Sequence, residues 1–157
     1  YLIEAFRQIE TDKKLVIAGG SSDTDEFLRE LKKLAKDDKR IIFTGFVQGQ
    51  LLEELYSNAY VYALPSDLEG MPLSLLEAMS YGNCCVVSDI AECAEVVEDK
   101  AVVFSKSNVK QLKEKLQDLC DHPEKVQSYK NSASDFICRK YNWDDAVNRT
   151  VALYRKR

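Results

Sequence analysis

The sequence predicts an α/β fold: an open, mostly parallel, Rossmann-like sheet of about five strands with helices on both faces. Short apolar runs of strand length alternate, as far as Phe104, with amphipathic runs of helix length. These short runs are apolar throughout, which is typical of parallel strands buried on both faces. With 157 residues and 45% hydrophobic content, the chain is expected to form a single domain with its own core.

The first half of the chain opens with a helix. Apolar residues from Tyr1 to Ile9 follow helical spacing with no capping residue before them, so we expect residues 1–157 to be a domain truncated at its N-terminus. Strands are expected over residues 14–18, 41–43 and 60–64, separated by helices over residues 24–35 and 50–58. The first strand leads into a loop over residues 19–23. The first of these helices is expected to be amphipathic, with Phe27, Leu28, Leu31 and Leu34 on one face. The second is expected to turn Leu51, Leu52, Leu55 and Tyr56 inward.

In the second half, a helix opens at Pro72 and closes at Gly82. Then come strands over residues 84–88 and 101–104, separated by a short segment around residues 92–97. From residue 108 the pattern is helical only: one helix capped by Ser107, one from His122-Pro123 to about residue 139, and one over residues 143–157. Trp143 is expected to anchor this last helix in the core.

Composition excludes several classes of function. The 22 basic and 26 acidic residues give a net charge of −4 without a basic cluster, which argues against nucleic-acid binding. Five cysteines without C-x-x-C spacing indicate buried or free thiols of a cytoplasmic protein, and no metal site. The single histidine, His122, is expected to be a solvated or capping residue. No apolar run reaches the roughly 18 residues of a membrane span.

The stretch from Leu64 to Asp89 carries the candidate site. Glu69 lies in a turn, where an acid is often only a solvated loop residue. Glu77 lies in the apolar helix that follows, either on a solvent-facing stripe or facing a cleft where sugar hydroxyls bind its two oxygens. Pro72 at the first helical position leaves N–H groups near Leu73 and Ser74 free for a phosphate oxygen. Together these features favour a socket for a polar, phosphorylated ligand.

Several motifs of this stretch resemble the signature of one enzyme family. They are Pro65-Ser66, Glu69-Gly70-Met71-Pro72, Leu76-Glu77-Ala78-Met79, Gly82 and Val86-Val87-Ser88-Asp89. The pattern is similar to that of the retaining nucleotide-sugar glycosyltransferases called family 4, or glycosyltransferase group 1. The resemblance runs nearly end to end and implies one half of a GT-B fold, the C-terminal, donor-binding domain, with the acceptor-binding domain absent.

The resemblance implies a role for each matching residue. Glu77 matches the acid that grips the donor's ribose hydroxyls, and Glu69 matches an acid beside the transferred sugar that orients it or supports positive charge at its anomeric carbon. The backbone of Gly70, Met71, Pro72, Leu73 and Ser74 matches the segment that contacts the sugar and the diphosphate. Phe46 and Val47 match the segment on which the base stacks, and Gly19 matches a glycine that keeps the cleft wall open.

The implied enzyme is a retaining hexosyltransferase of polysaccharide biosynthesis that uses a UDP-, GDP- or ADP-sugar without a metal or other cofactor. A glycan or lipid-linked acceptor would bind the absent domain, so the fragment alone is expected to be inactive. The full-length protein is expected in the cytoplasm, with peripheral association at the inner face of the membrane as a second location. Alternatives are an epimerase-like nucleotide-sugar enzyme and a non-enzymatic, flavodoxin-like binding module.

The sequence also departs from the family's pattern. The family places an Arg and a Lys near the end of this domain's first strand, in a segment that would precede Tyr1. Loss of two cations beside a diphosphate leaving group is expected to cost several kcal/mol of charge stabilisation. Ala91-Glu92-Cys93 stands where the family commonly has Gly-Gly, and Asp99-Lys100-Ala101 stands in place of a glycine-rich turn.

Overall fold

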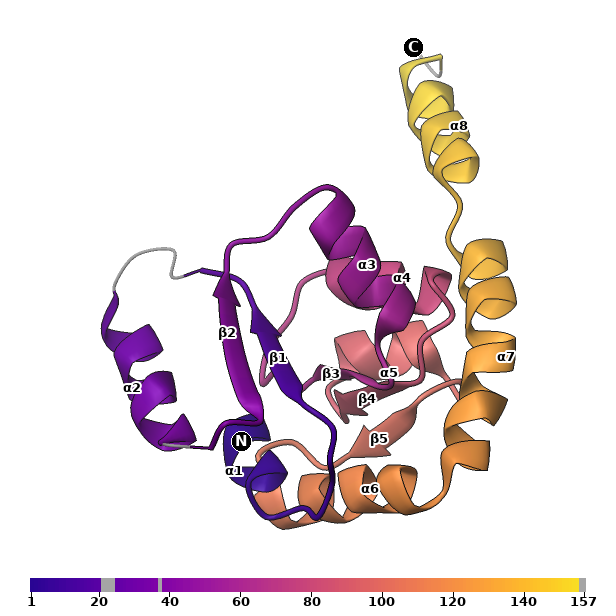
Figure 1. Ribbon diagram of the computed structural model, residues 1–157. Coiled ribbons are helices and arrows are strands. Elements are labelled where there is room, and N and C mark those ends of the chain that lie inside the picture. The colour runs from indigo at the N-terminus through magenta and orange to yellow at the C-terminus, as the bar shows by residue number, and fades with distance from the viewer. Residues whose placement is uncertain (21–24, 37, 156–157) are drawn as a thin grey trace.

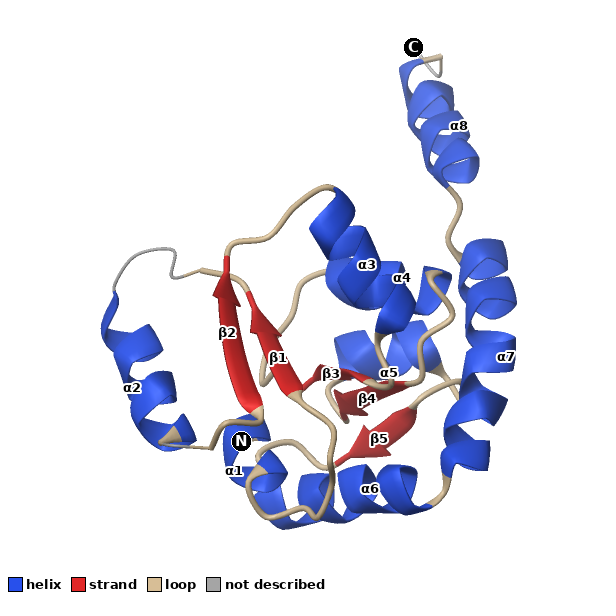
Figure 2. Ribbon diagram, in the orientation of Figure 1, coloured by secondary structure: helices blue, strands red, loops and turns tan. Residues whose placement is uncertain are grey.

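The computed structural model describes residues 1–20, 25–36 and 38–155. In these residues the chain forms eight helices and five strands, which alternate as far as β5 and are followed by three consecutive helices (Figures 1 and 2). They are α1 (Leu2–Phe6), β1 (Leu15–Ala18), α2 (Asp25–Ala35), β2 (Ile41–Gly45), α3 (Gln50–Asn58), β3 (Tyr62–Leu64), α4 (Leu73–Ser80), β4 (Cys85–Ser88), α5 (Ala91–Val97), β5 (Val102–Phe104), α6 (Val109–Asp121), α7 (Pro123–Lys140) and α8 (Trp143–Tyr154). Residue 24, the expected start of the second helix, and residues 21–23 of the expected loop lie outside the described residues.

All strand pairs are parallel, which confirms the predicted α/β class. The strands divide between two sheets, however, with orders β1-β2 and β3-β4-β5 (Figure 2). Within the described residues, β1 pairs only with β2, and β3 pairs only with β4. In the part of the chain that the structure describes, one backbone edge of β1 and one of β3 therefore lack a strand partner.

The core is built around β4, whose four residues are all buried. Successive side chains of a strand point to opposite faces of the sheet. Cys85 and Val87 accordingly pack with α4, α5 and α7, whereas Val86 packs on the other face with α1 and α6. Helices thus cover both faces of the three-stranded sheet, and the segment on each side of β4, including α4, is held rigidly.

The two-stranded sheet buries much less. Phe27 of α2 is 65% exposed, and Leu34 of the same helix is also exposed. Leu51 of α3 is exposed as well, and α3 has no fully buried residue. The inward orientation predicted for Leu51 was therefore wrong, whereas Leu52, Leu55 and Tyr56 of α3 are half-buried. The apolar face of α2, which lies beside β2 (Figure 1), is only partly covered, with Leu28 and Leu31 half-buried.

The C-terminal end also differs from the prediction. Helix α8 extends beyond α7 and away from the body of the domain, so Trp143 is 84% exposed and anchors no core in the described residues (Figure 1). The cap of α6 is Asn108, whose side chain accepts a hydrogen bond from the N–H of Gln111. Ser107 is not the cap, because its backbone turns into the left-handed region with φ of 62°. No described helix is long and apolar enough to cross a membrane.

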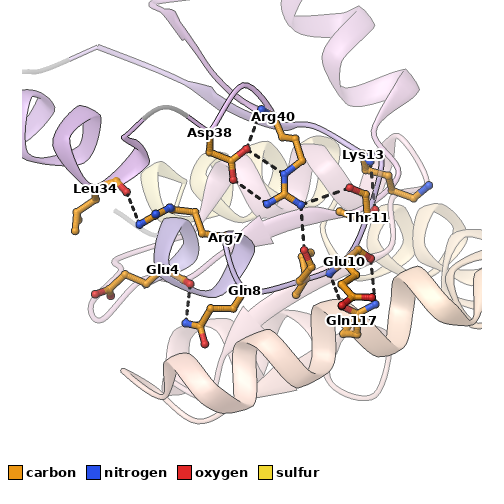
Figure 3. Close-up of polar contacts among 11 residues, drawn as sticks. Glu4, Arg7, Gln8, Glu10, Thr11, Lys13, Leu34, Asp38, Arg40 and Gln117 are labelled. Atoms are coloured by element: carbon orange, nitrogen blue, oxygen red, sulfur yellow. Dashed lines mark hydrogen bonds and ion pairs between the residues drawn. The ribbon is translucent and has the colours of Figure 1, made fainter.

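Arg40 connects the segment before β1 to the start of β2 (Figure 3). Its guanidinium forms a paired contact with the carboxylate of Asp38, at 3.0 and 2.8 Å. The same group donates to the carbonyl of Ile9 at 3.0 Å and lies 4.9 Å from the ring centroid of Phe6. This cluster holds the start of β2 in place. The predicted site residues lie at the opposite end, where the chain leaves the strands.

Candidate functional site

Glu69 lies on the loop that follows β3, and hydrogen bonds tie this loop to the sheet. The hydroxyl of Ser66 donates to Oε1 of Glu69 at 2.6 Å. The hydroxyl of Ser88, at the end of β4, donates in turn to the backbone carbonyl of Ser66. Glu69 is half-buried rather than a freely solvated loop residue. Its carboxylate is therefore held in a defined orientation by the strand end beneath it.

A second set of contacts holds the other side of this loop. The hydroxyl of Tyr1 donates to Oδ2 of Asp67 at 2.8 Å, and Ser107 contacts Oδ1 of Asp67 at 3.3 Å. The ammonium group of Lys106 donates to the Asp67 carbonyl at 2.7 Å. Sequence reasoning missed these residues because they come from three distant segments, and no local pattern indicates that they meet.

The start of α4 differs by one residue from the prediction. Pro72 is the N-cap and Leu73 the first helical residue. The N–H of Leu73 is not free, because it donates to the carbonyl of Met71 at 2.8 Å. For the N–H of Ser74, no acceptor is found among the described residues, so the expected open donor is present there.

Gly70 leaves open space before this helix start. Nothing lies within 4 Å of a Cβ built at Gly70, and its backbone is not left-handed, so the turn itself does not require a glycine. The backbone of Gly70 and the exposed Met71 are therefore open to a ligand approaching the start of α4.

Glu77 lies on the exposed side of α4 and lines a cavity. Leu75, Ala78 and Met79 occupy the opposite face of the helix and are fully buried in the core. The cavity has a volume of about 220 Å³ and is lined by Gly49, Leu52, Glu53, Tyr56, Glu77 and Tyr81. The carboxylate thus faces a shallow cleft between α3 and α4. It is also exposed, so the solvent-facing and the cleft-facing positions expected from the sequence each describe part of its surroundings.

Three tyrosines support the polar residues of α4. Tyr56 donates to Oε2 of Glu77 at 3.1 Å, and Tyr62 donates to Oγ of Ser74 at 2.8 Å. The ring of Tyr56 stacks on Tyr81, with centroids 5.4 Å apart. Burial raises the pKa of Tyr62 to about 12 and also raises the pKa of Tyr56, so both hydroxyls remain protonated donors. Helical spacing identified Tyr56 only as an inward-facing residue, which gave no sign of this role.

The remaining predicted contacts lie at the exits of β1 and β2. Gly19 has φ of 136°, a conformation that glycine adopts without strain, and its surroundings are open. Phe46 is 76% exposed, and Val47 is half-buried. Neither residue lines the cavity at Glu77, whose wall from this loop is Gly49. Phe46 is a free apolar surface at the strand exit, not part of a closed pocket.

Other candidate groups have structural partners. His122 lies at the junction of α6 and α7, where its Nδ1 is 2.9 Å from Asp118. Cys84, Cys85 and Cys93 are buried free thiols, and burial raises the pKa of Cys84 to about 12. Among the described residues, no group of three or more His, Cys, Asp or Glu side chains is arranged to hold a metal ion.

A larger cavity, of about 590 Å³, lies between α7 and the end of α5 and contains none of the predicted site residues. Its charged side chains form ion pairs, Lys140 with Glu98, Arg139 with Asp135, and Lys100 with the neighbouring Asp99. These pairs leave little unbalanced charge to attract a ligand, so the smaller cavity at Glu77 is the better candidate.

The comparisons with known proteins agree on one family. The family described as "Glycosyl transferases group 1" matches residues 1–136. The uncharacterized glycosyltransferase MJ1607 of Methanocaldococcus jannaschii is 30% identical over 159 residues, which cover 99% of this chain and 40% of that protein. The O-antigen chain mannosyltransferase B of Escherichia coli is 25% identical over 162 residues, covering 98% of this chain and 41% of that protein.

Solved structures share the fold. Anabaena Alr3699/HepE in complex with UDP and glucose superposes with a TM-score of 0.87 at 17% identity, covering 99% of this chain and 43% of that one. Sucrose-phosphate synthase from Thermosynechococcus elongatus gives a TM-score of 0.87 at 23% identity, covering 99% of this chain and 41% of that one. The chain thus spans less than half the length of these relatives and structural neighbours.

Proposed function

Because the chain belongs to the family of glycosyl transferases group 1, we propose that it binds a nucleotide-diphosphate sugar and serves retaining transfer of a hexosyl group. The observation that carries the proposal is the carboxylate of Glu77, which lines a cavity beside a helix start whose Ser74 N–H is open. A structural neighbour, Anabaena Alr3699/HepE, was crystallised with UDP and glucose, which supports a donor of this class.

The donor's ribose is proposed to bind Glu77. A carboxylate accepts hydrogen bonds from hydroxyls, and bonds to charged groups contribute about 1.5–3 kcal/mol each. The diphosphate would bind at the start of α4, where the open N–H of Ser74 and the positive end of the helix dipole favour a phosphate oxygen. The exposed ring of Phe46 offers an apolar surface for the base, with Val47 beside it.

Glu69 is proposed to act on the transferred sugar. Positive charge develops at the anomeric carbon in an oxocarbenium-like transition state, and a carboxylate fixed nearby stabilises that charge. Ser66 occupies Oε1 of Glu69 and leaves Oε2 without a hydrogen-bond partner in the described residues. We propose that Glu69 serves as an oriented anion and not as a covalent nucleophile, and that the leaving diphosphate assists the incoming hydroxyl.

We also propose that part of the full-length protein outside residues 1–157 completes the sheet with a parallel strand between β1 and β3. Each of these two strands has one unpaired edge in the described residues, and the two belong to separate sheets there. A strand there would end beside the site and could supply the cations that the diphosphate requires. A longer version of the protein should then protect the amides of β1 and β3 from hydrogen exchange more strongly than residues 1–157 do.

The acceptor is proposed to be a glycan or a lipid-linked glycan bound by a domain outside residues 1–157. A cytoplasmic enzyme that works at the inner face of a membrane fits such an acceptor. Because the acceptor domain is proposed to lie outside residues 1–157, we expect these residues to bind donor nucleotides without catalysing transfer. Turnover by purified residues 1–157 would contradict the assignment of acceptor binding to a separate domain.

Isothermal titration of residues 1–157 with UDP, GDP and ADP tests the proposal. We expect at least one nucleotide to bind, and Glu77→Gln to weaken that binding by about tenfold or more, as expected for loss of a charged hydrogen bond. Glu114→Gln removes the same charge from α6, away from the cavity, and should leave binding unchanged. A folded sample that binds none of the three nucleotides at millimolar concentration would overturn the proposed function.

A further inference from the structure

The cavity at Glu77 contains a second polar side chain that the family resemblance does not assign. We propose that Tyr56 is a positioning residue: it fixes the carboxylate of Glu77 so that the site distinguishes a ribose from a 2′-deoxyribose. This inference rests on the proposed binding of a nucleoside diphosphate. It adds that Tyr56 orients the carboxylate of Glu77 and that selectivity for ribose follows from this orientation.

The first support is the geometry of the hydroxyl. Tyr56 belongs to α3, and its hydroxyl is 3.1 Å from Oε2 of Glu77 on α4. The carbonyl of Ser74 lies farther away, at 3.5 Å, so Glu77 is the better acceptor for the single proton. In the described residues, Oε2 accepts this one hydrogen bond and Oε1 has no partner. The carboxylate therefore presents Oε1 and the remaining lone pair of Oε2 to a ligand.

The second support is that Tyr56 is itself held from several directions. Its ring stacks on Tyr81 and lies 6.0 Å from the ring of Tyr62. Its backbone carbonyl accepts a 2.9 Å hydrogen bond from the side chain of Asn83. Asn83 is buried and also donates to the carbonyl of Ala78 on α4. Because both the backbone and the ring of Tyr56 are held in place, its hydroxyl keeps the carboxylate of Glu77 in a defined position.

The fixed carboxylate of Glu77 has a consequence for the selectivity of the site. The terminal torsion of a glutamate side chain is broad, so an unsupported carboxylate rotates easily. A rotating carboxylate can turn toward whichever hydroxyl is present, whereas a fixed one binds well only when both hydroxyls of the ribose meet it. Loss of the Tyr56 hydroxyl should therefore weaken binding of the ribonucleotide more than binding of the deoxyribonucleotide. Ordering a side chain on binding costs about 0.5–1.5 kcal/mol, which sets the expected scale at roughly two- to tenfold.

The experiment measures dissociation constants of residues 1–157 for UDP and 2′-deoxyUDP, or for the guanosine or adenosine pair if that base binds better. The variants are Tyr56→Phe, which keeps the stacked ring, and the control Tyr154→Phe, which removes a hydroxyl from the exposed helix α8, away from the cavity. Tyr56→Phe should weaken binding of the ribonucleotide by about two- to tenfold and leave the deoxyribonucleotide nearly unchanged. Tyr154→Phe should change neither affinity.

The outcomes separate the two proposals. If the unchanged protein binds a ribonucleotide and Tyr56→Phe leaves the ribose-to-deoxyribose ratio as it was, the positioning role is overturned while the proposed function stands. Equal weakening of both nucleotides by Tyr56→Phe indicates a purely structural role and also overturns the inference. If the unchanged protein binds none of the nucleotides, the proposed function fails first, and the role of Tyr56 fails with it. Thermal unfolding of each variant confirms that the comparison is made on folded protein.

Discussion

The hydroxyl of Ser66 donates a 2.6 Å hydrogen bond to Oε1 of Glu69, the residue three positions further along the same loop. Ser66 is itself fixed by Ser88 at the end of β4, the most buried strand of the domain. The orientation of the Glu69 carboxylate thus depends on the core through two serines. A loop carboxylate that would otherwise move freely is preorganised, which is what electrostatic support of a developing charge requires.

Ser66→Ala should release Glu69 without disturbing nucleotide binding. In the full-length enzyme we expect kcat to fall by about ten- to a hundredfold, because small displacements of a positioned group have effects of this size. Binding of UDP to residues 1–157 should be unchanged, since Ser66 does not line the cavity at Glu77. Ser132→Ala on α7 removes a hydroxyl elsewhere and serves as the control. A Ser66→Ala enzyme with normal turnover would show that Glu69 needs no support from Ser66.

Asp38 should make the domain sensitive to acid. Hydrogen bonds from Arg40 lower the pKa of Asp38 from 3.8 to about 2. Because the folded-state pKa lies below the unfolded value, the stabilisation is complete above about pH 4 and is lost as the pH falls toward about 2. Urea midpoints measured from about pH 6 downward should show the unchanged protein losing its advantage over Asp38→Asn across that window. A constant difference between the two proteins at all pH values would contradict the assignment.

The sequence was most informative where burial is complete and least informative where the sheet is incomplete. Around β4, continuous apolar runs located the strand, and the 64–89 stretch located the turn and helix that carry Glu69 and Glu77. In α2 and α8, the same apolar spacing predicted buried faces that are exposed, because periodicity identifies an apolar face and not what covers it. Tyr56 and Ser88 could not be recognised from sequence, because their roles depend on contacts between residues about twenty positions apart.

Replacement of Glu98 by glycine should leave the domain more stable than replacement by alanine. It ends α5 with φ of 48° and ψ of −116°, a combination that only glycine adopts easily. Glu98→Gly and Glu98→Ala both remove the 2.6 Å ion pair with Lys140, so their difference reports the backbone alone. We expect the glycine variant to be more stable than the alanine variant by about 1 kcal/mol or more. Equal free energies of unfolding would mean that this turn relaxes without cost.

The cysteines should differ sharply in reactivity. Cys138 is exposed, whereas Cys84, Cys85 and Cys93 are buried. Burial raises the pKa of Cys93 to about 11, and a thiol reacts as its thiolate. Iodoacetamide at neutral pH should therefore label Cys138 first in folded protein, as read by peptide mass spectrometry. In Cys138→Ser, any labelling that remains should be confined to the half-buried Cys120, and the three buried thiols should stay unmodified. Fast modification of Cys93 in that variant would indicate local opening of α5.

Trp143 should contribute little to the stability of residues 1–157. It was expected to anchor the last helix in the core, but it is 84% exposed on a helix that extends away from the domain (Figure 1). Surface substitutions change the free energy of unfolding by about 0.5 kcal/mol or less, so Trp143→Ala should be nearly neutral. Leu112→Ala in α6 is the contrast, because Leu112 is fully buried and removal of such a side chain costs about 2–5 kcal/mol.

Denaturant unfolding followed by circular dichroism measures both substitutions in the same protein. A loss of several kcal/mol from Trp143→Ala would mean that α8 folds back onto the domain in solution and that the original expectation of a core anchor was correct. A neutral result leaves an exposed apolar face on α8, which includes Val147 and Tyr154. In that case, adding the rest of the full-length protein should decrease the solvent accessibility of Trp143, because an apolar face of this kind is stabilised by burial against another surface. The emission maximum of this single tryptophan would then shift to shorter wavelength, and an unchanged maximum would show that α8 stays exposed.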